Sequence, residues 1–372
     1  MTTISTVSDR LQGLLCVLVS VAVTVAAAGA ISCGGSNSAT PYDGVPRDLP
    51  PLTAPSGSWT WIDVPESTCD DGTPTGFAVN PKDTSDLFIF FEGGGACWDY
   101  LTCVVAQSAT TGPVQAAQWA TRAQNLPQPF DRTRDSNPFR NATMVYIPYC
   151  TGDLHVGDKV MNYMSGSTTK TYNHKGLPDT IAFLSRVAST WKNPTRVVVS
   201  GSSAGGYGAA LTYDLARRSF PDARMYLVDD AGPLLEGSAV SDSLRSAWIS
   251  SWNIGGFIDD LCTGCSADFS LLESKLVQRY PGDRLALLSS LQDGTISFYF
   301  SLSAQTFQTD LLQMINDRLV PTHNFRSFVI AGNQHTLLGT MTTSTVGTQV
   351  LEPWLDTMVN DGSDWASVQA TP

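Results

Sequence analysis

Residues 196–208 have the sequence RVVVSGSSAGGYG, in which a β-branched run leads into Gly-x-Ser-x-Gly. Ser203 is the central serine, and the helical stretch 207–220 follows at once. This is the pattern of a nucleophile elbow, where a strand ends, the chain turns sharply and a helix begins. Gly201 and Gly205 flank the turn, where a Cβ would collide with a neighbouring strand or helix. The stretch therefore predicts an activated serine; the alternative is an ordinary strand–turn–helix junction.

Further apolar runs predict the other strands of a parallel sheet. Residues 87–91 and 144–149 are continuous apolar runs, typical of strands covered on both faces. Residues 225–228, 284–290 and 326–331 each end in a polar loop, and helical stretches lie between them. This alternation predicts an α/β fold of the α/β-hydrolase type, with helices on both faces of a central, mostly parallel sheet. Functional residues are then expected beyond the carboxyl ends of the strands.

The composition limits the possible functions. The 372 residues are 42% hydrophobic, which is enough for the core of one large α/β domain. A formal net charge of −12 argues against nucleic-acid binding and against a densely charged anionic polymer as substrate. Arg132, Arg134 and Arg140 form a local basic cluster, which we expect in a solvated loop.

The N-terminal residues predict export. Residues 11–30 are apolar and follow a short head whose only basic side chain is Arg10, which is typical of a signal peptide. The sequence AISC at residues 30–33 predicts lipoprotein processing, with Cys33 as the lipidated first residue. Cleavage after Ala28 or Ala30 and an uncleaved anchor are the alternatives.

We therefore expect three regions along the chain. A signal peptide covers residues 1–32, a flexible tether rich in Gly, Ser and Pro covers residues 33–58, and a single domain covers residues 59–372. The protein is expected to be lipid-anchored in the bacterial cell envelope or secreted, and monomeric.

The cysteines agree with export. Apart from Cys16 and Cys33 there are six, an even number that is typical of disulfides in an oxidising compartment. The spacing leaves the pairing open; we predict Cys97–Cys103 and Cys262–Cys265 as short loops, which leaves Cys69–Cys150. Zinc at the Cys262/Cys265 CxxC is the alternative, but no second CxxC or histidine pair accompanies it. We expect no metal and no cofactor.

A glycine triplet follows the strand predicted over residues 87–91, in the sequence EGGGAC at residues 92–97. Such a loop can point backbone N–H groups into a space that no side chain fills. Gly94 and Gly95, together with Ala204 after the central serine, are the candidate oxyanion-hole donors. A phosphate-binding loop is the competing interpretation, but no Gly-Lys-Ser/Thr follows.

A serine nucleophile needs a base, and the chain has four histidines. In an α/β-hydrolase the order along the chain is serine, acid, histidine. His155 and His174 precede Ser203, and His323 lies before its strand, whereas His335 follows that strand. We therefore predict His335 as the base, His174 as a surface or capping residue, and the loop of His155 near the mouth of the site.

The acid that orients the base is less sharply defined. Asp293 follows the penultimate predicted strand, the usual place for this residue. Asp229 and Asp230, one strand earlier, are the alternatives. We favour Asp293.

Four motifs are shared with a known family: FEGGGACW at residues 91–98, IPYC at 147–150, GSSAGG at 201–206 and NQH at 333–335. In these motifs the chain resembles the pectin acetylesterase / Notum family of extracellular carboxylesterases, from about residue 59 to residue 368. The resemblance implies an α/β-hydrolase-like fold, Ser203, Asp293 and His335 as a catalytic triad, and Gly94, Gly95 and Ala204 as oxyanion donors. Gly95 stands where the Notum branch has a bulky aromatic residue, so the long lipid pocket of that branch is not implied.

The expected function is that of an exported serine esterase. The family resemblance suggests an ester substrate, with O-acetyl groups on a polysaccharide as the preferred class. A lipase or peptidase on the same scaffold would share the triad, and a catalytically silent binding domain could keep the fold. We expect no nucleic-acid partner, and membrane contact only through a lipid at Cys33.

Overall fold

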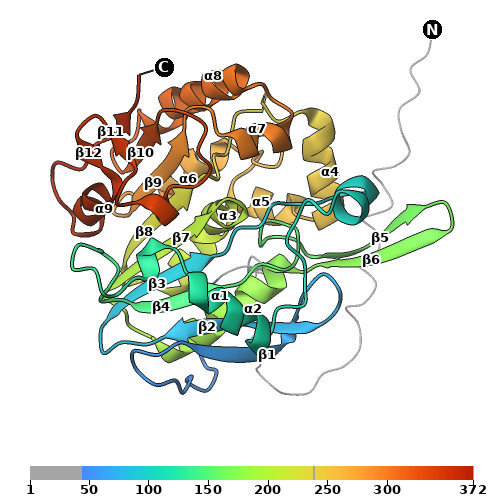
Figure 1. The fold of residues 1–372 in the computed structure, drawn as a ribbon, viewed down its shortest axis with the longest axis horizontal. Coiled ribbons are helices and arrows are strands. Elements are labelled where there is room, and N and C mark those ends of the chain that lie inside the picture. The colour runs from blue at the N-terminus through green and yellow to red at the C-terminus, as the bar shows by residue number, and fades with distance from the viewer. Residues whose placement is uncertain (1–43, 238, 372) are drawn as a thin grey trace, which may run out of the picture. The chain divides into compact units, whose positions relative to one another are not determined.

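A nine-stranded sheet forms the centre of the fold in this computed structural model, which describes residues 44–237 and 239–371. The strand order is β1-β2-β4-β3-β7-β8-β9-β10-β13 (Figure 1). The strands are β1 (Thr60–Thr68), β2 (Pro74–Asn80), β3 (Asp86–Phe91), β4 (Thr143–Ile147), β7 (Arg196–Ser202), β8 (Arg224–Asp230), β9 (Arg284–Ser290), β10 (Phe325–Ile330) and β13 (Val368–Gln369).

The sheet is mostly parallel, as predicted. Every pair from β4 through β3, β7, β8, β9 and β10 to β13 is parallel, and β2 alone pairs antiparallel with both of its neighbours. The carboxyl ends of β3, β7, β8, β9 and β10 therefore meet at one edge of the sheet, and the loops that follow them lie there together.

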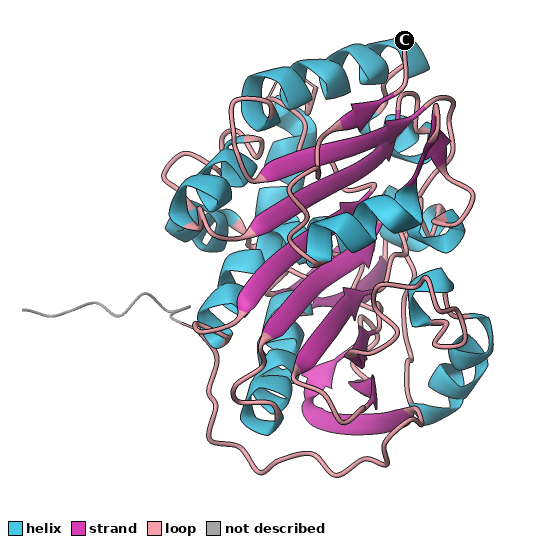
Figure 2. Cartoon of the chain, turned by 90° about the vertical axis from the view of Figure 1, so that its left-hand side faces the viewer, coloured by secondary structure: helices cyan, strands magenta, loops and turns pink. Residues whose placement is uncertain are grey.

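Helices cover both faces of the sheet (Figure 2). Val197 and Val199 of β7 are buried in the same core cluster as residues of α2, α3, α6 and α8, whereas Val198 is buried in a second cluster with residues of α1 and α9. Apolar residues on both faces of one strand explain its continuous β-branched run. The helices are α1 (Ala116–Arg122), α2 (Gly176–Thr190), α3 (Ala204–Ser219), α4 (Asp242–Trp252), α5 (Gly255–Leu261), α6 (Leu271–Arg279), α7 (Gly294–Phe300), α8 (Ala304–Met314) and α9 (Leu351–Val359).

A two-stranded hairpin, β5 (Lys159–Ser165) and β6 (Thr168–His174), extends away from the main sheet (Figure 1). Its buried aromatic residues, Tyr163 and Tyr172, cluster with Cys97 and Cys103. The Tyr172 hydroxyl donates a hydrogen bond to the Cys103 carbonyl over 2.6 Å. The hairpin is therefore anchored to the loop after β3 through its aromatic side chains.

The tether predicted over residues 33–58 is wrong in its described part. Val45 is buried, and Leu52 packs against the same core cluster. The backbone N–H of Leu52 donates to the Thr190 hydroxyl, 2.9 Å away, at the end of α2. Apolar residues within the polar, proline-rich stretch thus hold it on the domain. The predicted signal peptide and Cys33 lie outside the described residues.

Candidate active site

The elbow forms where β7 gives way to α3. Ser203 has φ 60° and ψ −124°, a strained conformation for a residue with a side chain. A Cβ on Gly201 would collide with the carbonyl of Gly205, and one on Gly205 with the carbonyl of Phe91. The backbone N–H of Ser203 donates to the carbonyl of Asp230, 2.7 Å away. The two glycines are therefore required by close backbone contacts, as the sequence predicted.

Asp293 and His335 meet at the same edge of the sheet. The Nδ1 atom of His335 lies 2.8 Å from a carboxylate oxygen of Asp293. The other carboxylate oxygen caps α7 by accepting the N–H groups of Thr295 and Ile296, each at 2.9 Å. The Asp293 side chain is fully buried and its orientation is fixed from both sides. The acid that we favoured is thus the one that contacts the histidine.

The second ring nitrogen of His335 is free. Its Nε2 atom is buried and has no hydrogen-bond partner among the described residues, the hydroxyl of Ser203 included. The structure therefore joins Asp293 to His335 but does not join His335 to Ser203 by a hydrogen bond. In enzymes without bound substrate such a bond is often long and tightens only in the complex.

The alternative acids have other partners. The Asp230 carboxylate accepts hydrogen bonds from the Ser202 hydroxyl at 2.7 Å and from the N–H groups of Leu337 and Leu338 at 2.7 and 3.0 Å. Burial raises the pKa of Asp230 to about 6. Asp229 accepts the N–H of Gly232, and burial raises its pKa well above the usual range. The sequence did not disclose this role of Asp230, because its partners lie on two distant segments.

The glycine loop after β3 lies against the elbow. A Cβ on Gly93 would collide with the carbonyl of Ser202, so this glycine allows the close approach. Gly94 and Gly95 have φ values of 154° and 73°. Among the described residues, no hydrogen bond is donated by the N–H groups of Gly94, Gly95 or Ala204. All three groups therefore remain available as donors, and Ala204 begins α3, whose N-terminus favours negative charge.

Glu92 orders the start of this loop. Its carboxylate accepts the N–H of Tyr149 at 2.9 Å and forms an ion pair with Arg122. Its carbonyl oxygen lies 2.8 Å from Nε2 of His155. These contacts fix the backbone just before the candidate oxyanion donors.

A tight apolar cavity adjoins the nucleophile. Ser203, Ala204 and Gly95 line it together with aromatic and aliphatic side chains: Leu154, Tyr207, Trp248, Ile296, Tyr299 and Phe300. Its volume is about 20 Å³, room for little more than one water molecule. A Cβ on Gly95 would collide with the Tyr299 hydroxyl, which fills the space that a larger residue would need. The space directly beside Ser203 is therefore small and apolar.

The two histidines that precede the elbow are buried. The ring of His174 lies 2.8 Å from the Thr151 carbonyl through Nδ1 and 2.8 Å from the Tyr163 hydroxyl through Nε2. The prediction of a surface or capping histidine is therefore wrong for His174, because the β5–β6 hairpin covers it. His155 is buried too, and burial lowers its pKa to about 4.

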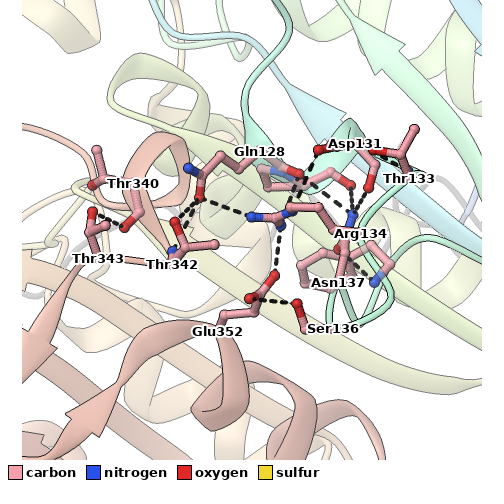
Figure 3. A network of polar contacts seen from close by, with 12 residues as sticks. Gln128, Asp131, Thr133, Arg134, Ser136, Asn137, Thr340, Thr342, Thr343 and Glu352 are labelled. Carbon is pink, nitrogen blue, oxygen red and sulfur yellow. Dashed lines mark hydrogen bonds and ion pairs between the residues drawn. The ribbon is translucent and has the colours of Figure 1, made fainter.

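A polar network holds the segment that follows His335 (Figure 3). Thr342 donates its N–H and its hydroxyl to the side-chain oxygen of Gln128, both at 3.1 Å. Arg134 forms an ion pair with Glu352 of α9 at 2.6 Å. The expected solvated loop is therefore wrong for Arg134, whose side chain is only 22% exposed and ties residues 128–137 to α9.

The structure contains the three predicted disulfides, Cys69–Cys150, Cys97–Cys103 and Cys262–Cys265. Cys262 and Cys265, the pair considered as zinc ligands, are thus bonded to each other. Among the described residues, the ligand atoms of Cys97, Cys103 and His174 lie close enough for a metal ion, but the two sulfurs form one of these disulfides. No helix in the described part of the chain has the length and apolar character to span a membrane.

Comparisons with known proteins agree with the fold. The structure is similar to that of the Wnt deacylase Notum from Drosophila, with a TM-score of 0.61 and 16% identity over 85% of this chain and 96% of that one. Palmitoleoyl-protein carboxylesterase notum2 of Xenopus laevis is 28% identical over 40% of this chain and 29% of its own length. An inactive palmitoleoyl-protein carboxylesterase, notum1b of Danio rerio, is 31% identical over 28% of this chain and 69% of its own length.

The matches cover different shares of this chain and of its relatives. The chain spans less than a third of the length of the Xenopus relative. The family model named Pectinacetylesterase matches residues 58–275, more than half of the chain. That stretch contains the glycine loop and Ser203, whereas Asp293 and His335 follow it. The chain belongs to the pectinacetylesterase family.

Proposed function

We propose that this protein is a serine carboxylesterase that removes short acyl groups, acetyl above all, from hydroxyl groups of a carbohydrate. The observation that carries the proposal is the contact of His335 with the buried Asp293: the Nε2 atom of His335, which has no partner among the described residues, lies at the sheet edge where Ser203 occupies a strained elbow. Family membership supports ester chemistry, and the three disulfides support work in an oxidising compartment outside the cytoplasm.

The proposed reaction has two halves. Nε2 of His335 removes the proton of Ser203 as the hydroxyl attacks the ester carbonyl, and Asp293 stabilises the imidazolium that results. The N–H groups of Gly94, Gly95 and Ala204 stabilise the oxyanion. His335 then protonates the leaving alcohol, and a water activated by His335 attacks the acyl-serine and releases the acid.

The tight cavity beside Ser203 supports a short acyl group over the long chain that a lipase would need. A catalytically silent binding domain is the second candidate, because one relative is named inactive and because Ser203 is not hydrogen-bonded to His335. A direct assay separates these possibilities.

The experiment measures hydrolysis of 4-nitrophenyl esters from acetate to dodecanoate by the wild type and by Ser203→Ala. We expect acetate to be hydrolysed fastest and Ser203→Ala to lose at least about a thousandfold in kcat. Ser250→Ala changes an exposed serine of α4 and serves as control. Hydrolysis fastest with long chains would favour a lipase. Wild-type rates equal to those of Ser203→Ala would favour the binding domain.

A further inference from the structure

An open groove lies next to the cavity at Ser203. It has a volume of about 590 Å³ and lies between the loop after β3, the N-terminal part of α4 and the end of α7. Tyr299 and Phe300 line both the groove and the cavity, so the two hollows lie against the same two side chains. The groove is therefore the candidate binding place for the part of a substrate that extends beyond the cavity at Ser203.

The groove combines aromatic faces with hydroxyl groups. Trp98 and Tyr299 supply the rings, and Ser241 and Ser243 of the α4 N-terminus supply the hydroxyls. Flat apolar surface with a few polar groups is suited to a sugar ring, which has an apolar C–H face and a hydroxylated rim.

Trp98 is held in place from several sides. Its backbone N–H donates to the Thr102 hydroxyl at 2.9 Å, and its backbone carbonyl accepts the Ser251 hydroxyl at 2.6 Å. Its ring packs edge-on against Trp248, with centroids 5.8 Å apart. A fixed aromatic ring binds a ligand with little loss of side-chain entropy.

The charged side chains that line the groove limit the kind of sugar that it can bind. Asp99 is the one charged side chain among its lining residues. The neighbouring hollow at α7 and α8 is lined by uncharged residues, Gln292 and Asn333 among them. Neither hollow has an arginine or lysine in its lining, whereas a polyuronate carries a carboxylate on each sugar and would need cations. The net charge of −12 adds repulsion.

We propose that this groove binds the alcohol half of the ester as a neutral acetylated oligosaccharide, and that it discriminates against uronic-acid polymers. The inference rests on the proposed esterase function. It adds the class of the alcohol, which the acyl cavity does not define.

The test compares kcat/KM for acetylated xylo-oligosaccharides and acetylated oligogalacturonates of equal length, with 4-nitrophenyl acetate in parallel. We expect at least about a tenfold preference for the neutral substrate, and a rise of the galacturonate rate with salt as the repulsion is screened. Equal rates, or faster hydrolysis of the galacturonate, would overturn the inference. Absence of Ser203-dependent hydrolysis of 4-nitrophenyl acetate would instead overturn the esterase proposal.

Variants in the groove give a second test. Asp99→Lys should raise the galacturonate-to-xylan ratio of kcat/KM about tenfold. Trp98→Ala should lower kcat/KM for the oligosaccharide about tenfold, mainly through KM, and Trp98→Phe should recover part of it. Leu101→Ala changes an exposed residue outside the groove and is the control. If Trp98→Ala does not fold, Asp99→Lys still decides: an unchanged ratio contradicts the proposal.

Discussion

The carboxylate of Asp230 accepts a hydrogen bond from the backbone N–H of Leu337, 2.7 Å away, and so joins the end of β8 to the loop that carries His335. The same residue accepts the Ser202 hydroxyl through its carboxylate and the Ser203 N–H through its carbonyl, both at 2.7 Å. One buried aspartate therefore fixes the elbow and the histidine loop relative to each other.

We predict that Asp230→Asn lowers kcat for 4-nitrophenyl acetate by about ten- to a hundredfold and leaves KM nearly unchanged. The amide keeps one oxygen acceptor but replaces the other with a donor, so the Ser202 hydroxyl or one N–H of the histidine loop loses its partner. A small misplacement of reacting groups is costly in rate. Steady-state kinetics at fixed pH provide the measurement.

Asp229→Asn is the matched control for Asp230→Asn. One carboxylate oxygen of Asp229 has no hydrogen-bond partner in the described part of the chain, and burial raises the pKa of Asp229 well above the usual range. An asparagine at this position resembles the protonated acid and should preserve activity. Equal losses in the two variants would argue against a specific positioning role for Asp230.

Asp293→Asn should lower kcat by about four orders of magnitude with little effect on stability. The asparagine oxygen can still cap α7, but the amide cannot hold the His335 tautomer that Nδ1–H donation to a carboxylate requires. Rates and thermal unfolding are measured on the same preparations. Asp293→Ala should lose the cap as well and about 1 kcal/mol of stability. Near-wild-type rates for Asp293→Asn would exclude this residue as the acid.

Gly95→Ala should reduce both activity and stability. The residue has φ 73°, and an added Cβ would collide with the Ser108 carbonyl and the Tyr299 hydroxyl. We expect about a hundredfold loss in kcat and a loss of about 1–3 kcal/mol in the free energy of unfolding. Gly256→Ala in α5, where a Cβ meets no atom within 4 Å, is the control and should be neutral or slightly stabilising. Full activity of Gly95→Ala would remove Gly95 from the oxyanion site.

The parts of the site that the sequence predicted are those encoded locally. Ser203, Asp293 and His335 each follow a strand, so strand patterns and chain order were enough to select them. The short disulfide loops were predicted from close spacing, although the spacing alone left the pairing open. Asp230 differs, because its role depends on contacts with residues 202 and 337 that no local pattern records.

The β5–β6 hairpin shows why other elements were missed. Its strands are mostly polar, and Tyr163 and Tyr172 are buried only because the loop closed by Cys97–Cys103 covers them. A strand stabilised by such tertiary contacts has no clear apolar alternation. The misplacement of His174 has the same cause, since the hairpin carries and buries it.

His155 contributes a pH dependence of stability whose sign follows from its burial. It is buried with Nε2 2.8 Å from the Glu92 carbonyl, and burial lowers its pKa from the usual 6.5 to about 4. Between these values His155 binds more protons in the unfolded chain than in the folded one, so its contribution to stability falls as the pH falls. The stabilising contribution is complete above pH 6.5 and is lost as the pH falls through about 4.

We predict that His155 accounts for a loss of about 3 kcal/mol in the free energy of unfolding between pH 7 and pH 4. Urea unfolding at pH 7, 5.5 and 4 is compared for the wild type and His155→Gln. The variant starts less stable, and the gap should narrow by about that amount at pH 4. His323→Gln, at an exposed histidine, should follow the wild type. A gap that stays constant with pH would mean that His155 is as easily protonated in the folded protein as in the unfolded chain, and that its burial beside the glycine loop has no energetic cost.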